Sequence, residues 1–178
     1  MSGAPGSNAN RWAFSQRYIN GVIARAELRS TLTYRLLPRL QVGVEVNPRA
    51  EDAAKAGPLV NWLAVTETAN RPAVIVGTSS DRIGTPSGQS FYATASKNLR
   101  RETHLPIAPY FGFAYGTYEG KFRPIGGLNV GFTEQFNALV IFDGVHVHPL
   151  LNYSYQRHTF SFILIRAKHP GVSYSVAF

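Results

Sequence analysis

The segment from residue 22 to residue 46 reads VIARAELRSTLTYRLLPRLQVGVEV, and its polarity alternates from one residue to the next. From 22 to 36 the even positions are mostly apolar, whereas the odd positions mostly carry charged or hydroxyl side chains. Successive side chains of a β-strand point to opposite faces, so this pattern predicts a long strand with one apolar face. After a Pro-Arg pair the alternation resumes from 40 to 46. We therefore predict a β-hairpin.

The same alternation recurs along most of the chain, in segments separated by turn-forming residues. The predicted strands are 12–19, 22–36, 40–46, 60–68, 73–81, 91–98, 107–118, 122–132, 136–143, 147–155, 159–166 and 171–178. Helical spacing is confined to a short stretch at 50–56. Tight polar turns alternate with longer loops rich in glycine and proline, which is typical of a meander. The sequence therefore predicts an all-β fold, an antiparallel up-and-down barrel of ten to twelve strands.

The composition excludes several classes of protein. Charged residues make up 16% of the 178, against roughly 25% in an ordinary soluble domain, and aromatic residues make up 12%, which excludes a disordered chain. The longest apolar run, at 138–142, is far shorter than the roughly 18 residues of a membrane-spanning helix. Without cysteine there is no disulfide, thiolate metal site or cysteine nucleophile. The net charge of +8 is scattered, with no basic helix or arm, so we predict no nucleic-acid partner.

Two architectures use such a meander. One is a soluble barrel that binds a hydrophobic ligand in its interior, and the other is a membrane barrel with the polarity reversed. In the strand predicted at 107–118, large residues such as Phe111 and Phe113 alternate with small ones such as Gly112 and Gly116. A glycine-rich face suits a narrow lumen, and the low charged fraction is unusual for a soluble sheet. We therefore predict a transmembrane barrel and keep the soluble barrel as the alternative.

The last predicted strand alternates small residues with apolar or aromatic ones, which are Val172, Tyr174, Val176 and Phe178. This pattern resembles the C-terminal signal by which bacterial outer-membrane barrels are recognised for insertion. The first ten residues are rich in glycine, serine and asparagine, which predicts a flexible N-terminal segment (1–10) before a single barrel domain (11–178). They lack the basic start and apolar core of a secretory signal, so we expect that such a signal has been removed.

A longer stretch is similar to a known group of proteins. The run RPAVIVGTSSDRIGTP at 71–86 and the run YATASK at 92–97 resemble segments of bacterial outer-membrane β-barrels, including those associated with exopolysaccharide export. The pieces PIGG (124–127), DGV (143–145) and HPGVS (169–173) have the same character, and the resemblance covers roughly 40–178. It implies a location in the bacterial outer membrane. The partners implied are the lipid bilayer, the barrel-assembly machinery and other subunits of a membrane complex.

If the apolar faces point to lipid, the polar faces line the lumen. The predicted lumen-lining residues are Arg25, Glu27, Arg29, Arg35, Glu45, Arg123 and Asn129. Four arginines then face two glutamates, which indicates either a plug of ion pairs or a constriction that favours anions. A second charged set lies beside the longer loops and predicts a loop rim that is solvated or binds a ligand: Asp81, Arg82, Lys97 and Asp143.

Two patterns of histidine suggest sites of chemistry. His146 and His148 would share one face of a strand and so form half of a zinc or copper site, but no further ligand is evident. Ser154 or Ser161 near His158 would suit an outer-membrane lipase, but no sequence signature supports it. We predict no enzyme activity, no metal and no cofactor. The predicted function is a structural or scaffolding outer-membrane barrel, or a small anion-preferring channel.

Overall fold

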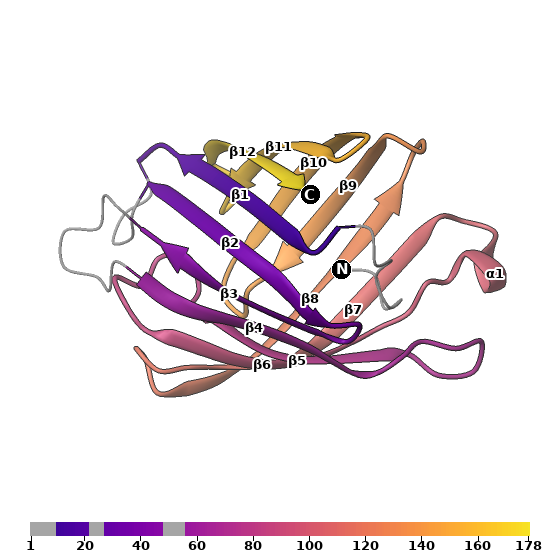
Figure 1. The fold of residues 1–178 in the computed structure, drawn as a ribbon, viewed down its shortest axis with the longest axis horizontal. Coiled ribbons are helices and arrows are strands. Elements are labelled where there is room, and N and C mark those ends of the chain that lie inside the picture. Colours follow the sequence, from indigo (N-terminus) through magenta and orange to yellow (C-terminus); the bar gives the residue numbers. More distant parts are fainter. Residues whose placement is uncertain (1–9, 22–26, 48–55) are drawn as a thin grey trace.

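The computed structural model of the chain describes residues 10–21, 27–47 and 56–178. These residues form twelve β-strands and one short helix, in a closed antiparallel barrel (Figure 1). The strands are β1 (Trp12–Ile19), β2 (Leu28–Leu37), β3 (Leu40–Val46), β4 (Ala56–Val65), β5 (Ala73–Ser80), β6 (Gln89–Ser96), β7 (Ile107–Gly116), β8 (Lys121–Gly131), β9 (Phe136–Phe142), β10 (Val147–Tyr155), β11 (His158–Ile165) and β12 (His169–Ala177). The predicted fold class is confirmed, with the strand number at the upper end of the predicted range.

The barrel is closed by its first and last strands. Every strand pairs with its neighbours in the sequence, and β1 also pairs with β12. At the seam Trp12 and Phe178 exchange two backbone hydrogen bonds, each 2.9 Å long, and Figure 1 shows the indigo and yellow strands side by side. Closure leaves no unpaired edge among the described strands, which removes the usual route to edge-to-edge aggregation.

The two ends of the barrel differ. We call the end with the connections that follow odd-numbered strands the mouth, and the end with β1's start and β12's finish the terminal end. The two-residue connections 38–39 and 156–157 lie at the terminal end, as expected for tight turns. The terminal end also carries the long connection 97–106 with helix α1 (Arg100–Thr103), which the sequence did not predict. A four-residue helix is too short to show a hydrophobic period.

The structure differs from the sequence prediction at the start of β2, and it leaves two other predicted segments mostly undescribed. The strand predicted from residue 22 is shorter, because β2 begins at Leu28 and Glu27 lies in a bend before it. The helix predicted at 50–56 falls outside the described residues except for Ala56, which begins β4. The predicted flexible segment 1–10 also lies outside them, apart from Asn10. No helix in the described part of the chain is long and apolar enough to cross a membrane.

The polarity of the barrel is inverted relative to a water-soluble protein. Large apolar side chains point outward and are exposed, and every strand contributes at least one of them. The buried apolar residues inside the described barrel are few: Ile19, Leu59, Leu63, Ala73, Ile75, Ile163 and Ile165. Between them, polar side chains of neighbouring strands bond to each other, as Asn152 does with Asn137 at 2.8 Å and Gln41 with Thr33 at 2.8 Å.

Inward-facing glycines make room for large rings in the lumen. A Cβ at Gly127 would lie 2.5 Å from the ring of Tyr110, and a Cβ at Gly77 would lie 2.7 Å from the hydroxyl of Tyr92. The Tyr92 hydroxyl in turn donates to the side-chain oxygen of Asn61. These rings occupy part of the lumen, which suits a barrel below the size of the open porins.

Candidate functional site

The connection between β5 and β6, residues 81–88, crosses the lumen at the mouth. Its Ile83 packs against the buried cluster of Ile19, Ile163 and Ile165. The last two belong to β11, which is six positions from β5 in either direction around the barrel. A side chain can reach the opposite wall only if its loop folds inward. We call residues 81–88 the crossing loop.

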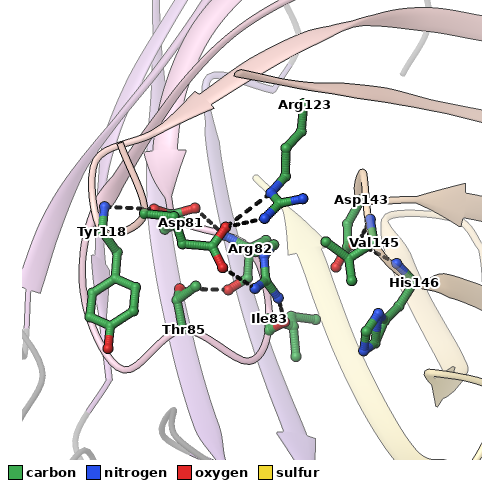
Figure 2. Close-up of polar contacts among 10 residues, drawn as sticks. Asp81, Arg82, Ile83, Thr85, Tyr118, Arg123, Asp143, Val145 and His146 are labelled. Atoms are coloured by element: carbon green, nitrogen blue, oxygen red, sulfur yellow. Dashed lines mark hydrogen bonds and ion pairs between the residues drawn. The ribbon is translucent and has the colours of Figure 1, made fainter. Parts of the chain in front are cut away.

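Hydrogen bonds hold the crossing loop in this position. Asp81 is only 7% exposed, and its carboxylate accepts from the backbone N–H of Arg82 at 2.8 Å and of Tyr118 at 3.2 Å. The buried hydroxyl of Thr85 donates to the Arg82 carbonyl at 2.9 Å. Figure 2 shows these contacts around the loop. Gly84 has φ +99°, in the left-handed region that favours glycine.

Glu119, in the connection between β7 and β8, joins two arginines. It accepts from Arg82 through Oε1 at 2.5 Å and from Arg123 through Oε2 at 2.9 and 2.6 Å. We call these three residues the Glu119 clamp. Hydrogen bonds from Arg82 and Arg123 lower the pKa of Glu119 to about 2, and the bond from Glu119 raises the pKa of Arg82. The clamp fastens the crossing loop to the β8 wall and keeps one net positive charge.

Asp143 and His148 form a second ionisable pair at the mouth. His148 is 3% exposed, with Nε2 2.9 Å from Asp143 Oδ2, and its Nδ1 accepts from the backbone N–H of Arg166 at 3.1 Å. The acceptor role of Nδ1 places the ring proton on Nε2, so Nε2 donates to Asp143. Burial acts to raise the pKa of Asp143, but hydrogen bonds from His148 and from the backbone of His146 and Val145 outweigh it and lower that pKa.

The positions of His146 and His148 do not support the half of a metal site that their spacing suggests. His146 lies in the connection before β10 and not on the strand, so it does not share a strand face with His148 (Figure 2). Both ring nitrogens of His148 are occupied, which leaves no lone pair for a metal ion or for general-base catalysis. Within residues 10–21, 27–47 and 56–178, no group of three or more metal-binding side chains occurs.

The predicted lumen-lining residues have different positions in the structure. Arg29 of β2 forms an ion pair with Glu45 of β3, whose side chain is 1% exposed. Arg123 belongs to the Glu119 clamp. Arg35 and Asn129 alternate with outward-facing leucines and so lie on the inner face.

Two further residues of that set are at or beyond the start of β2. Glu27 directly precedes β2, its carboxylate accepts from the backbone N–H of Gly21 at 3.0 Å, and its carbonyl accepts from the N–H of Ile19 at 2.9 Å. Its place in the lumen stays a prediction. Arg25 lies outside the described residues.

Sequence reasoning missed two charged residues of the interior. Arg17 of β1 stands directly opposite Arg29 in the register of β1 and β2. The alternation of β1 is weak because Gln16 is on its outer face. Glu119 was missed because it lies in a turn, where neither strand alternation nor helical spacing indicates a partner.

The predicted loop rim divides between the two ends of the barrel. Asp81, Arg82 and Asp143 lie at the mouth, where they are folded into the network described above. The grouping was wrong for Lys97, which follows an even-numbered strand and lies at the terminal end. There its ammonium donates to the Ala69 carbonyl and pairs with Glu102 at 3.2 Å. Antiparallel strands send alternate connections to opposite ends, so equal loop length does not imply the same end.

The serine and histidine residues considered for lipase chemistry do not assemble. His158 contacts the hydroxyl of Tyr174 at 2.8 Å on the outer face, and Ser154 contacts Thr159 at 3.1 Å on the inner face. Ser161 also alternates with outward-facing phenylalanines, so it faces the lumen.

No protein-family model matches the chain, and a search of curated proteins finds no relative of it. The similarity to barrels of exopolysaccharide export therefore stays a prediction.

Proposed function

We propose that this chain is a bacterial outer-membrane β-barrel with a structural or scaffolding role and at most a small anion-preferring pore. The observation that carries the proposal is the apolar belt around the outside. Phe122 is 77% exposed, Phe111 58% and Trp62 51%, and large apolar side chains are exposed on all twelve strands.

A continuous belt favours lipid over a protein partner as its cover. Soluble monomers rarely expose apolar patches above a few hundred Å², and a partner protein covers one side only. A belt that runs around the whole circumference needs a cover that surrounds the barrel, which a bilayer provides. The soluble alternative would require the large side chains inside, where Glu45 and Arg29 are instead.

Aromatic residues lie towards both ends of the belt, as in girdles at the two membrane interfaces. Towards the terminal end the rings of Trp12 and Tyr34 lie 4.7 Å apart, and at the mouth those of Tyr115 and Phe122 lie 4.9 Å apart. On β12 the belt continues through the residues that resemble an assembly signal, Val172, Tyr174, Val176 and Phe178. We include the barrel-assembly machinery as a partner on that resemblance.

The interior supports a scaffold better than a wide channel. The crossing loop lies across the mouth, and large rings and bonded amides occupy part of the lumen below it. Arginines outnumber the carboxylates that neutralise them in the Glu119 clamp, so any ion that passes meets a positive surface. Electrostatic screening is weak in so narrow a space, which favours anions.

Nitroxide labelling tests the orientation of the belt. The chain has no cysteine, so single substitutions give unique labels. We expect labels at Leu32 and Phe162 to collide with oxygen dissolved in the bilayer, and labels at their strand neighbours Thr31 and Ser161 to be protected from it. Lipid contact at Thr31 and Ser161, with Leu32 and Phe162 in water, would overturn the membrane assignment in favour of the soluble barrel.

A further inference from the structure

An open recess of about 430 Å³ lies at the mouth, beside the connections of β9 with β10 and of β11 with β12. Four of its six lining residues are basic and none is acidic: His146, Val147, Arg166, Ala167, Lys168 and His169. The recess is separate from the Glu119 clamp, whose charges neutralise one another in part. A hollow lined by basic groups is suited to an anion.

Three basic side chains of this recess lack a partner among the described residues. In the described part of the chain, no hydrogen bond or ion pair engages the side chains of Arg166, Lys168 or His169. The Nε of Arg166 is buried without a hydrogen-bond partner. The nearby carboxylates are committed elsewhere, Glu119 to two arginines and Asp143 to His148. A buried guanidinium N–H without an acceptor is costly unless a ligand supplies one.

The backbone of Arg166 has an uncommon left-handed conformation. Arg166 and Ala167 both have φ 55°, in the left-handed region, and the N–H of Lys168 donates to the Ile165 carbonyl across this turn at 3.0 Å. Turn positions with positive φ are usually occupied by glycine, asparagine or aspartate. An arginine in this conformation costs about 1 kcal/mol or more, so turn stability does not explain it. Its guanidinium lies over Gly84 of the crossing loop, where an added Cβ would be 2.2 Å from Nη2.

The neighbours of His146 make the recess electropositive. Burial lowers the pKa of His146, and the charges of Arg166, His148 and Arg82 lower it further, while Asp143 acts in the opposite direction. The imidazole therefore stays neutral without a ligand, and a bound anion would favour its protonation.

We propose that this recess binds a phosphate group, carried either by a soluble phosphorylated molecule or by a lipid headgroup. Arg166 offers the planar fork that binds two phosphate oxygens at once, Lys168 adds a point charge, and the two imidazoles add N–H donors. A phosphate has enough oxygens and charge to use donors on several sides. The recess is formed by this chain alone, so the proposal does not depend on the membrane assignment.

Titration of the purified barrel with inorganic phosphate tests the proposal. The imidazole signals of His146 and His169 in two-dimensional NMR, assigned with His146→Gln and His169→Gln, should shift saturably, while His104 at the terminal end stays fixed. Arg166→Gln and Lys168→Gln should each weaken binding about tenfold or more, because each removes a charge-assisted contact. Arg157→Gln, in a terminal-end turn, removes the same charge and should leave binding unchanged.

A second experiment distinguishes a lipid headgroup from a soluble phosphorylated molecule as the source of the phosphate. Nanodiscs of phosphatidylcholine with phosphatidic acid are compared with nanodiscs of phosphatidylcholine alone. Shifts in the first that free phosphate no longer increases assign the site to a headgroup, and shifts only with free phosphate assign it to a soluble ligand. Because Arg166→Gln can disturb its turn, Lys168→Gln with an unchanged thermal midpoint decides the matter. Absence of saturable shifts in both arms, or equal weakening by Arg157→Gln, would refute the site and leave the labelling result untouched.

Discussion

Glu119 is the residue that joins the crossing loop to the barrel wall. Glu119→Gln leaves an acceptor but removes the charge, so Arg82 and Arg123 repel each other without a carboxylate between them. The pair is partly exposed, and we expect the loop's opening free energy to fall by about 1 kcal/mol. Amide hydrogen exchange in residues 81–88 should then be roughly fivefold faster. Glu134→Gln, in the connection from β8 to β9, is the matched control, and equal acceleration by both would contradict the clamp.

The depressed pKa of Glu119 also predicts an acid response. Its folded pKa is about 2 and its ordinary value is 4.5, so its contribution to stability is complete above about pH 4.5 and is lost as the pH falls through about 2. The difference in thermal midpoint between the native protein and Glu119→Gln should be constant above pH 4.5 and vanish near pH 2. This subtraction removes the effect of Asp143, whose pKa is lowered too. A difference that persists at pH 2 would assign it to packing.

At the scale of residues, prediction from sequence was successful where a side chain sits in a regular strand. Alternation alone placed Arg29 and Glu45 on the same face of adjacent strands, and they are ion-paired. It could not place Glu119, because turn residues do not follow a period of two. It also could not foresee that the Arg166 side chain reaches back over Gly84, which depends on a left-handed backbone that Arg rarely adopts.

At the scale of elements, the glycines of the inner face set how closely the wall packs on its rings. Gly127→Ala would bring a methyl group to 2.5 Å from the Tyr110 ring and 2.3 Å from the Val140 carbonyl. Overpacking of this kind costs about 1 to 3 kcal/mol. Gly131→Ala, on the same strand and face, meets nothing closer than 3.4 Å and should be nearly neutral. Denaturant midpoints measure both, and equal midpoints would show that the ring moves freely.

Charged substitutions at two depths along one strand test whether the outer face lies in a bilayer. Val147 and Leu151 are exposed on the outer face of β10, the first at its mouth end and the second at its middle. Leu151→Arg should cost about 2 to 4 kcal/mol in a bilayer and Val147→Arg at most about 1, because the cost of a lipid-facing charge depends on depth. Refolding equilibria in vesicles give both values. A soluble barrel would tolerate the two substitutions equally.

The elements themselves were predictable because an inverted barrel needs alternation on every strand. Helix α1 and the crossing loop were not, for two physical reasons. Four residues show no helical period. The inward fold of a loop depends on contacts that are remote in sequence, such as that of Ile83 with the cluster of Ile19, Ile163 and Ile165. The end of the barrel at which Lys97 lies was also not predicted, because loop length alone does not show to which end a connection belongs.

At the scale of the whole molecule, a loop that lies across the mouth predicts little conductance. In planar bilayers we expect the native protein to show no steps or only small, anion-preferring ones. Replacement of residues 82–87 by two glycines removes the plug and should raise the conductance several-fold, with anion preference retained through Arg29 and Arg123. Shortening the 97–106 connection at the terminal end is the control and should change nothing. Large, weakly selective steps in the native protein would exclude a filled lumen.

The seam between β1 and β12 also governs how the protein folds. Each hairpin joins neighbours in the sequence, but this last pair joins the beginning of the barrel to its end, so the ring cannot close before β12 exists. A sheet with fewer strands has two unpaired edge strands and an incomplete apolar belt. Pairing β1 with β12 closes a loop that contains the rest of the chain, and the entropic cost of closing a loop grows only logarithmically with its length. The seven residue pairs between β1 and β12 together offset this cost. We therefore expect that no partial set of strands is stable on its own. The chain either closes into the complete barrel or remains an open sheet that is prone to aggregate.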